Sequence, residues 1–94
     1  MDFIQAKAHK AALKMAHDVT IIRLRAVSGD ERGPMNLTPD HIKATPEWRN
    51  AFNAERKAFK VCADFNKHMG KIFAKELRAE REARRIAIIM AKVA

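Results

Sequence analysis

Lysine and arginine side chains recur along one side of the C-terminal half of this chain, and such a row of positive charges could bind the phosphates of a nucleic acid. Residues placed 100° apart from Pro46 onward, as in an α-helix, put eight cations on one face. The row spans about 44 Å at about 1.5 Å per residue, comparable with about one turn of duplex nucleic acid. Asp64 is the main acid between them. The pattern predicts a contact with nucleic-acid backbone by Arg49, Arg56, Lys57, Lys60, Lys67, Lys71, Lys75 and Arg78.

A solvated helix face is the alternative interpretation of these cations, because no motif of a nucleic-acid reader accompanies them. The sequence has no zinc-ligand spacing, no basic region followed by a leucine heptad and no glycine–aromatic pattern of an RNA-binding sheet. Its aromatic side chains lie on the opposite face, at Trp48, Phe52, Phe59, Phe65 and Phe73. We therefore expect that face to pack in a core. Any contact with DNA or RNA would be made mostly with the backbone and would carry little sequence specificity.

Catalytic and metal-binding chemistry has no comparable support in the sequence. The four histidines, at positions 9, 17, 41 and 68, have no Cys or carboxylate neighbours at ligand spacing,. Glu76, Glu80 and Arg84 share one helical face, which is typical of a lattice of ion pairs rather than of an acid–base pair. No nucleophile stands beside a plausible base and no glycine loop could cradle a phosphate. We expect no enzyme activity, cofactor, metal or small-molecule substrate.

Apolar residues at the end of the chain point to a protein partner. Beyond the charged run of residues 78–85, isoleucine, methionine and valine side chains face several directions, and isolated apolar ends are costly to leave in water,. We expect Ile86, Ile89 and Val93, together with Trp48, to bind a second copy of the chain or a larger protein. The alternative function is therefore that of a protein-binding accessory factor, a modulator or inhibitor of a larger host complex of the kind that mobile elements encode.

Composition bounds both interpretations. The chain has 94 residues, a formal net charge of +8 and 48% hydrophobic residues, with three Gly and three Pro. These values favour one small helical domain and partners that are acidic or phosphate-rich. Cys62 is the only cysteine, so a reduced thiol and a cytoplasmic location are expected,. The last apolar segment is far shorter than the roughly 20 residues of a membrane span. Acids mixed into residues 46–94 further argue against a membrane partner.

The first helix is expected over residues 1–27, starting near Asp2 and ending before Gly29. Small and apolar residues recur there at steps of three and four, which predicts one face turned toward a core. They are Ile4, Ala8, Ala11, Met15, Val19, Ile22 and Ala26. A β-strand over residues 20–27 is the competing interpretation, because this segment is rich in β-branched residues, but the chain has no second strand-like run to pair with it.

A loop with a short helix is expected over residues 28–45, and one long helix over residues 46–92. The segments Thr38-Pro39-Asp40 and Thr45-Pro46-Glu47 each combine a hydroxyl for the N-cap, a proline for the first helical position and an acid in the first turn,. No proline interrupts the long helix, although Gly70 allows close packing or a bend.

The elements predict an all-α fold made of a single helical domain, residues 1–94. It would be a helical hairpin with a long C-terminal helix and a short intervening helical turn. A first helix of about 26 residues covers about 39 Å, whereas the long helix could extend about 70 Å. We therefore expect two helices of unequal length, with the far end of the longer one uncovered by its own chain.

Overall fold

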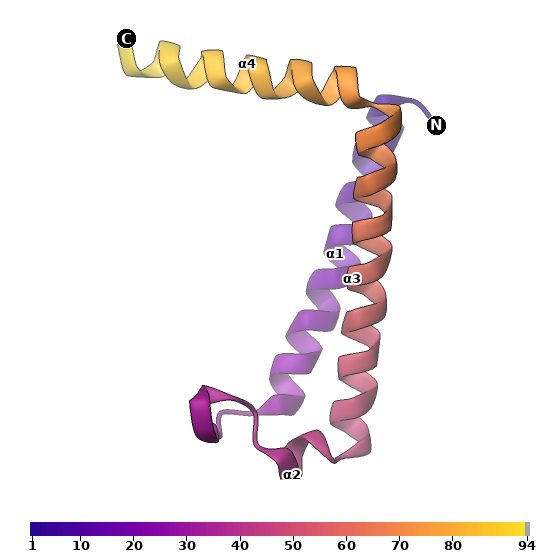
Figure 1. The fold of residues 1–94 in the computed structure, drawn as a ribbon, viewed down its shortest axis with the longest axis vertical. Helices are drawn as coiled ribbons and strands as arrows, with labels where there is room; N and C mark the ends of the chain where they lie inside the picture. The colour runs from indigo at the N-terminus through magenta and orange to yellow at the C-terminus, as the bar shows by residue number, and fades with distance from the viewer. Residues whose placement is uncertain (94) are drawn as a thin grey trace.

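The computed structural model describes residues 1–93 and is helical almost throughout (Figure 1). Two long helices, α1 (Phe3–Ser28) and α3 (Pro46–Ile72), are joined by a 3-10 turn η1 (Pro34–Asn36) and a short helix α2 (Asp40–Lys43); α4 (Ala74–Val93) follows α3. No strand occurs in the described residues. The all-α prediction is confirmed, and the segment 20–27 belongs to α1 rather than to a strand.

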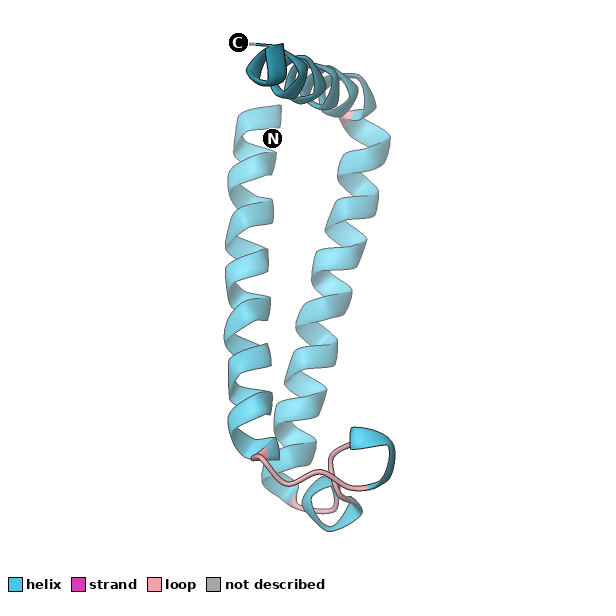
Figure 2. Cartoon of the chain, turned by 90° about the vertical axis from the view of Figure 1, so that its left-hand side faces the viewer, coloured by secondary structure: helices cyan, strands magenta, loops and turns pink. Residues whose placement is uncertain are grey.

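α1 and α3 pack antiparallel, as Figures 1 and 2 show from two sides. They contain 26 and 27 residues, so each is about 40 Å long. The connecting segment with η1 and α2 lies at one end of this hairpin, and the N-terminus lies at the other end, beside the start of α4.

The ends of α1 are fixed by local side-chain and backbone chemistry. Asp2 Oδ1 accepts a hydrogen bond from the Gln5 backbone N–H at 2.7 Å, and Gln5 Oε1 accepts one from the Asp2 backbone N–H at 3.0 Å. This reciprocal pair is a capping box, which satisfies two N–H groups that the first turn leaves free. Gly29 ends the helix at φ 69°, a conformation that suits glycine,. Both predicted caps are therefore confirmed.

The two Thr-Pro segments behave differently. Thr45 Oγ1 accepts a hydrogen bond from the Trp48 backbone N–H at 3.2 Å, and Pro46 occupies the first turn of α3. This start is as predicted. At α2, however, Pro39 is the N-cap and no side-chain hydrogen bond caps the helix, so the cap predicted at Thr38 is wrong. A helix of four residues forms few interior hydrogen bonds, so a cap at its start would stabilise little helical structure,.

The apolar row predicted to face the core from α1 faces the solvent instead. Its bulky members Ile4, Met15, Val19 and Ile22 are 79%, 69%, 65% and 65% exposed. The opposite face packs on α3 and mixes small, apolar and polar residues: Phe3, Ala6, Leu13, His17, Leu24 and Ser28. Both rows recur at helical spacing, so periodicity alone does not distinguish them. The mixed row packs on α3 because its polar side chains form hydrogen bonds with polar side chains of α3.

The single long helix predicted from residue 46 to 92 is also wrong. The helix is broken at Phe73, with φ −115° and ψ 30°, and α4 turns sharply away from the hairpin (Figure 1). α1 starts at Phe3, so a straight continuation of α3 past residue 73 would extend beyond the end of α1 and have no helix to pack against. The break keeps the Phe73 ring on the Phe3 ring, with centroids 5.5 Å apart. The prediction of unequal packed helices is replaced by two matched helices and a projecting third.

The core between α1 and α3 is one layer thick. Among the described apolar residues only Ala6, Ala51 and Met69 are buried, at 0%, 0% and 2% exposure. The other apolar side chains of the hairpin are partly or largely exposed, since each helix has a single neighbour. This thin core leaves large helix faces open on both sides of the hairpin.

Candidate nucleic-acid interface

The outward face of α3 carries six of the eight predicted cations. Ala51, Cys62 and Met69 face α1, and residues half a turn around the helix from them face away,. That outward face holds an exposed row of six cations, called here the α3 basic row: Arg49, Arg56, Lys57, Lys60, Lys67 and Lys71. From residue 49 to residue 71 the row covers about 33 Å.

Few internal partners compete for the charges of the α3 basic row. Lys60 Nζ lies 3.4 Å from Asp64 Oδ2, in a pair that is 79% and 67% exposed. Such exposed pairs are weak and exchange readily with other ions. None of the other five cations forms an ion pair within residues 1–93. The Arg56 guanidinium lies 5.1 Å from the centre of the Phe59 ring, which orients that side chain along the edge of the row,.

The remaining two predicted cations, Lys75 and Arg78, lie on α4 beyond the break. Both are exposed, but they do not continue the α3 basic row in a straight line. The predicted single stripe of eight cations is therefore split in two by the break at Phe73.

α4 has a basic row of its own that the sequence analysis missed. Arg78, Arg81, Arg85 and Lys92 are spaced by three, four and seven residues, which places them on one helical face,. All four are exposed, and Arg85 Nη2 is paired with Glu82 Oε1 at 2.6 Å. The charged run of residues 78–85 mixes arginines with glutamates, so this row becomes visible only when the two residue types are separated by helical angle,.

Trp48, predicted to bind a partner, is half-buried at the closed end of the hairpin. Its indole N–H donates to Ser28 Oγ at 2.9 Å, and its ring stacks on Phe52 with centroids 4.9 Å apart. Its donor is therefore used within the chain, between the end of α1 and the start of α3. The aromatic side chains of α3 lie along its inner face and its edges, where Phe59, at 46% exposure, contacts the α3 basic row through Arg56. The row itself holds no aromatic side chain on which a base could stack,.

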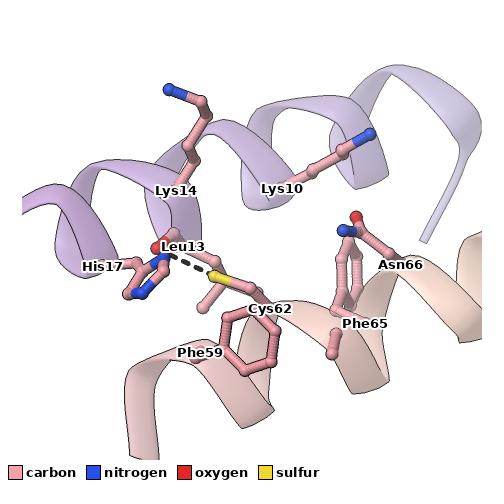
Figure 3. A pocket seen from close by; sticks show the side chains of 9 residues that line it. Lys10, Leu13, Lys14, His17, Phe59, Cys62, Phe65 and Asn66 are labelled. Carbon is pink, nitrogen blue, oxygen red and sulfur yellow. Dashed lines mark hydrogen bonds between the residues drawn. The ribbon is translucent and has the colours of Figure 1, made fainter. Parts of the chain in front are cut away.

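A hollow of about 420 Å³ opens between α1 and α3 near their middle (Figure 3). Lys10 and Lys14 stand at its rim, and Phe59 and Cys62 line it from α3. The Cys62 thiol donates to the Leu13 backbone carbonyl, with Sγ 3.3 Å from the oxygen. This thiol is engaged by a backbone acceptor and is half-buried.

The histidine of this hollow is also engaged. His17 Nε2 lies 3.3 Å from Glu55 Oε1, and both side chains are 16% exposed. The ring also packs on Phe59, with centroids 5.7 Å apart. Within residues 1–93 no group of three or more His, Cys, Asp or Glu side chains is placed to hold a metal ion. The pair therefore joins α1 to α3.

The predicted partner-binding residues at the end of the chain are all exposed. Ile86, Ile89 and Val93 are 50%, 50% and 75% exposed, as are the neighbouring Ile88 and Met90 at 53% and 61%. Every residue from 81 to 93 is exposed, because this part of α4 projects beyond the hairpin (Figures 1 and 2).

No protein-family model, no curated protein and no solved structure matches the chain. Among residues 1–93, no helix combines the length and the apolar character needed to cross a membrane.

Proposed function

We propose that this chain is a non-enzymatic cytoplasmic protein that binds the backbone of nucleic acid through the outward face of α3. The observation that carries the proposal is the α3 basic row, six exposed cations of which only Lys60 has a carboxylate partner in the described residues. Phosphate binding requires several cations in register on one rigid element, and it releases the counterions that surround a nucleic acid. A straight helix of 27 residues supplies such an element.

The length of the α3 basic row fits duplex nucleic acid. About 33 Å is close to one helical turn of B-DNA, which is about 34–36 Å. Lys75 and Arg78, on α4, point to a second stretch of phosphates outside the line of α3. The proposed contact is one of shape and charge, so it tolerates changes of base sequence.

Fluorescence anisotropy of a labelled duplex, measured over a series of salt concentrations, tests this proposal. Phosphate contacts predict that the logarithm of the binding constant falls linearly with the logarithm of the salt concentration, with a slope of about −0.9 per phosphate neutralised. Duplexes of unrelated sequence should bind within a few-fold of each other. A duplex that does not bind at low salt would remove the proposal.

A matched pair of variants separates the α3 basic row from net charge. Replacing Lys60, Lys67 and Lys71 by Gln should reduce the steepness of the salt slope by about 0.9 per lost contact. Replacing Arg23, Arg25 and Lys43 by Gln removes the same charge from other elements and should leave most of the affinity. Equal losses in the two variants would show that only the overall charge matters.

A protein-binding accessory factor is the second candidate, and the exposed apolar residues of α4 favour it. Ile86, Ile88 and Ile89 are each half-exposed with no cover from the hairpin. A pull-down from cell lysate, with and without nuclease, distinguishes the two functions. A protein retained after nuclease treatment, and lost when Ile86 and Ile89 are replaced by Asp, supports this second function. Proteins that disappear with nuclease treatment support nucleic-acid binding.

A further inference from the structure

The outer face of α1, opposite the face that packs on α3, is apolar along about six helical turns. It consists of Ile4, Ala8, Ala11, Met15, Val19, Ile22 and Ala26, all of them exposed. No charged residue lies within this row; one edge of it carries Lys7, Lys14, Asp18 and Arg25, and the other carries Arg23,. A helix that is apolar on two opposite faces is typical of the interior of a bundle. In this chain only one of the two faces is covered.

We propose that two copies of this chain form a dimer by packing α1 against α1 in antiparallel orientation, with the two-fold axis near Met15. This orientation sets Ile4 opposite Ala26, Ala8 opposite Ile22 and Ala11 opposite Val19, and Met15 opposite Met15 of the second copy. Each bulky side chain away from the axis then faces an alanine. Such alternation of large and small residues lets two helices approach closely without leaving voids.

The charged edge of the same face matches itself near the axis in this orientation, whereas toward its ends it brings Lys7 of one copy near Arg25 of the other,. Lys14 and Asp18 lie on one edge, and they form an exposed pair within their own helix at 3.3 Å. The two-fold axis brings Lys14 of one copy beside Asp18 of the other, twice per dimer. A two-fold interface requires one surface to match itself, and this face of α1 satisfies that condition along its apolar row and, at this edge, close to the axis.

The surface area of the chain is large enough to supply such an interface. Its accessible surface is 7534 Å², whereas a compact monomer of 10.7 kDa would expose about 5,500 Å². Its radius of gyration is 18.7 Å, against about 12 Å for a compact domain of this length. A standard interface buries about 800 Å² per partner. The excess surface of roughly 2,000 Å² therefore exceeds what a stable dimer needs.

The apolar residues of α4 do not offer the same self-matching surface. Ile86, Ile89, Met90 and Val93 share one side of α4 and Ile88 lies on the other, but these bulky side chains cover only the last two turns of that helix,. The outer face of α1 is therefore the surface assigned to the second copy. This dimer is independent of the nucleic-acid contact, because the α3 basic row lies on the far side of α3 from α1.

Sedimentation equilibrium of the full chain, with and without a substitution in this face, tests the proposal. The unaltered chain should have the mass of two chains, and Met15→Glu should reduce it to one, because it places two carboxylates at the axis. Met15 is 69% exposed, so circular dichroism should show the helical content of α1 and α3 retained. Ile88→Glu, on α4 at 53% exposure, is the matched control and should remain a dimer.

Cross-linking then tests the antiparallel orientation. In a Cys62→Ser background, Met15→Cys should be joined efficiently to its copy by a short bismaleimide, because the two side chains meet at the axis. Ile4→Cys should not be joined, because the two Ile4 positions lie at opposite ends of the interface. Efficient joining at position 4 would indicate parallel helices and would overturn the orientation. A monomeric unaltered chain, or a dimer lost with Ile88→Glu but kept with Met15→Glu, would overturn the interface.

Discussion

Trp48 and Ser28 show how single residues close the hairpin. The Trp48 indole N–H donates to Ser28 Oγ at 2.9 Å, and the Ser28 hydroxyl donates to the Leu24 backbone carbonyl at 2.7 Å. Ser28 is 8% exposed, so its hydroxyl has little access to water as a replacement partner. These two hydrogen bonds tie the start of α3 to the last turn of α1.

Trp48→Phe should lower the free energy of unfolding by more than about 1 kcal/mol, the usual net value of one hydrogen bond, because it also removes part of the ring that stacks on Phe52,. The measurement is urea denaturation at one fixed protein concentration, since a dimer makes stability depend on concentration. Ser28→Ala and the double variant complete a double-mutant cycle. If the two substitutions were additive, this hydrogen bond would not contribute to stability.

Met69 is the largest fully buried side chain, at 2% exposure. Met69→Ala should lower the free energy of unfolding by about 2–4 kcal/mol, because it leaves a cavity in a core that has few other buried side chains. Met90→Ala is the matched control, since Met90 is 61% exposed on α4. Chemical denaturation of both variants measures the difference. Similar small effects at both positions would show that the core between α1 and α3 is not packed as described.

Local signals in the sequence predicted the helix caps but not the contacts across the hairpin. Asp2, Gly29 and Thr45 act through neighbours within a few residues, so their roles can be read from the chain directly,. The choice of the α1 face that meets α3 depends instead on pairs such as His17 with Glu55, which are 38 residues apart. For this reason the apolar row of Ile4 and Met15 was assigned to the wrong side.

At the scale of elements, the direction of α4 depends on a few contacts with the start of α1. Lys7 Nζ lies 2.7 Å from Glu80 Oε1, and the Phe73 ring packs on Phe3. The two charged side chains are 53% and 30% exposed. Within the described residues, Glu80 Oε2 is buried without a hydrogen-bond partner, and Glu80 Oε1 accepts the hydrogen bond from Lys7 Nζ.

Glu80→Ala should broaden the range of α4 directions while changing the free energy of unfolding by less than about 1 kcal/mol, as for an exposed ion pair. Distances between spin labels at Arg23→Cys and Lys92→Cys in a Cys62→Ser background, measured in protein diluted with unlabelled chain, report this range. Glu82→Ala is the matched control, because the pair of Glu82 with Arg85 stays inside α4. Equal distance distributions in both variants would contradict a restraining role for Lys7.

The break at Phe73 could not be predicted from the local sequence. Gly70 indicated a possible bend, but no proline marks the site, and the residues after it favour a helix,. The helix is broken at the point where α1 ends beside it. The position of the break therefore depends on how α1 and α3 pack together, not on the residues near Phe73 alone. The same break splits the predicted row of eight cations, so that the sequence identified the exposed cations correctly without identifying their arrangement.

At the scale of the whole molecule, the net charge of +8 opposes a thin core. Arg56 and Lys60, like Lys67 and Lys71, are four residues apart on α3, and each such like-charged pair destabilises a helix by about 0.2–0.5 kcal/mol. Salt should therefore raise the thermal midpoint by screening this repulsion. The rise, measured by circular dichroism in increasing NaCl, should be smaller when Lys60, Lys67 and Lys71 are replaced by Gln. If the variant showed the same rise of the thermal midpoint as the unaltered chain, the repulsion would not come from these three lysines.

The uncovered length of α4 has a consequence for protease sensitivity. A helical segment without tertiary contacts opens to coil at almost no free-energy cost, and a dozen residues are too few to hold a helix firmly in water. The segment 81–93 should therefore exchange its amide hydrogens within seconds to minutes, long before those of α1 and α3. Brief trypsin digestion should cut after Arg81, Arg84 or Arg85, and in the exposed loop after Arg32, while α1 and α3 resist, so the parts of this chain would be degraded at very different rates,.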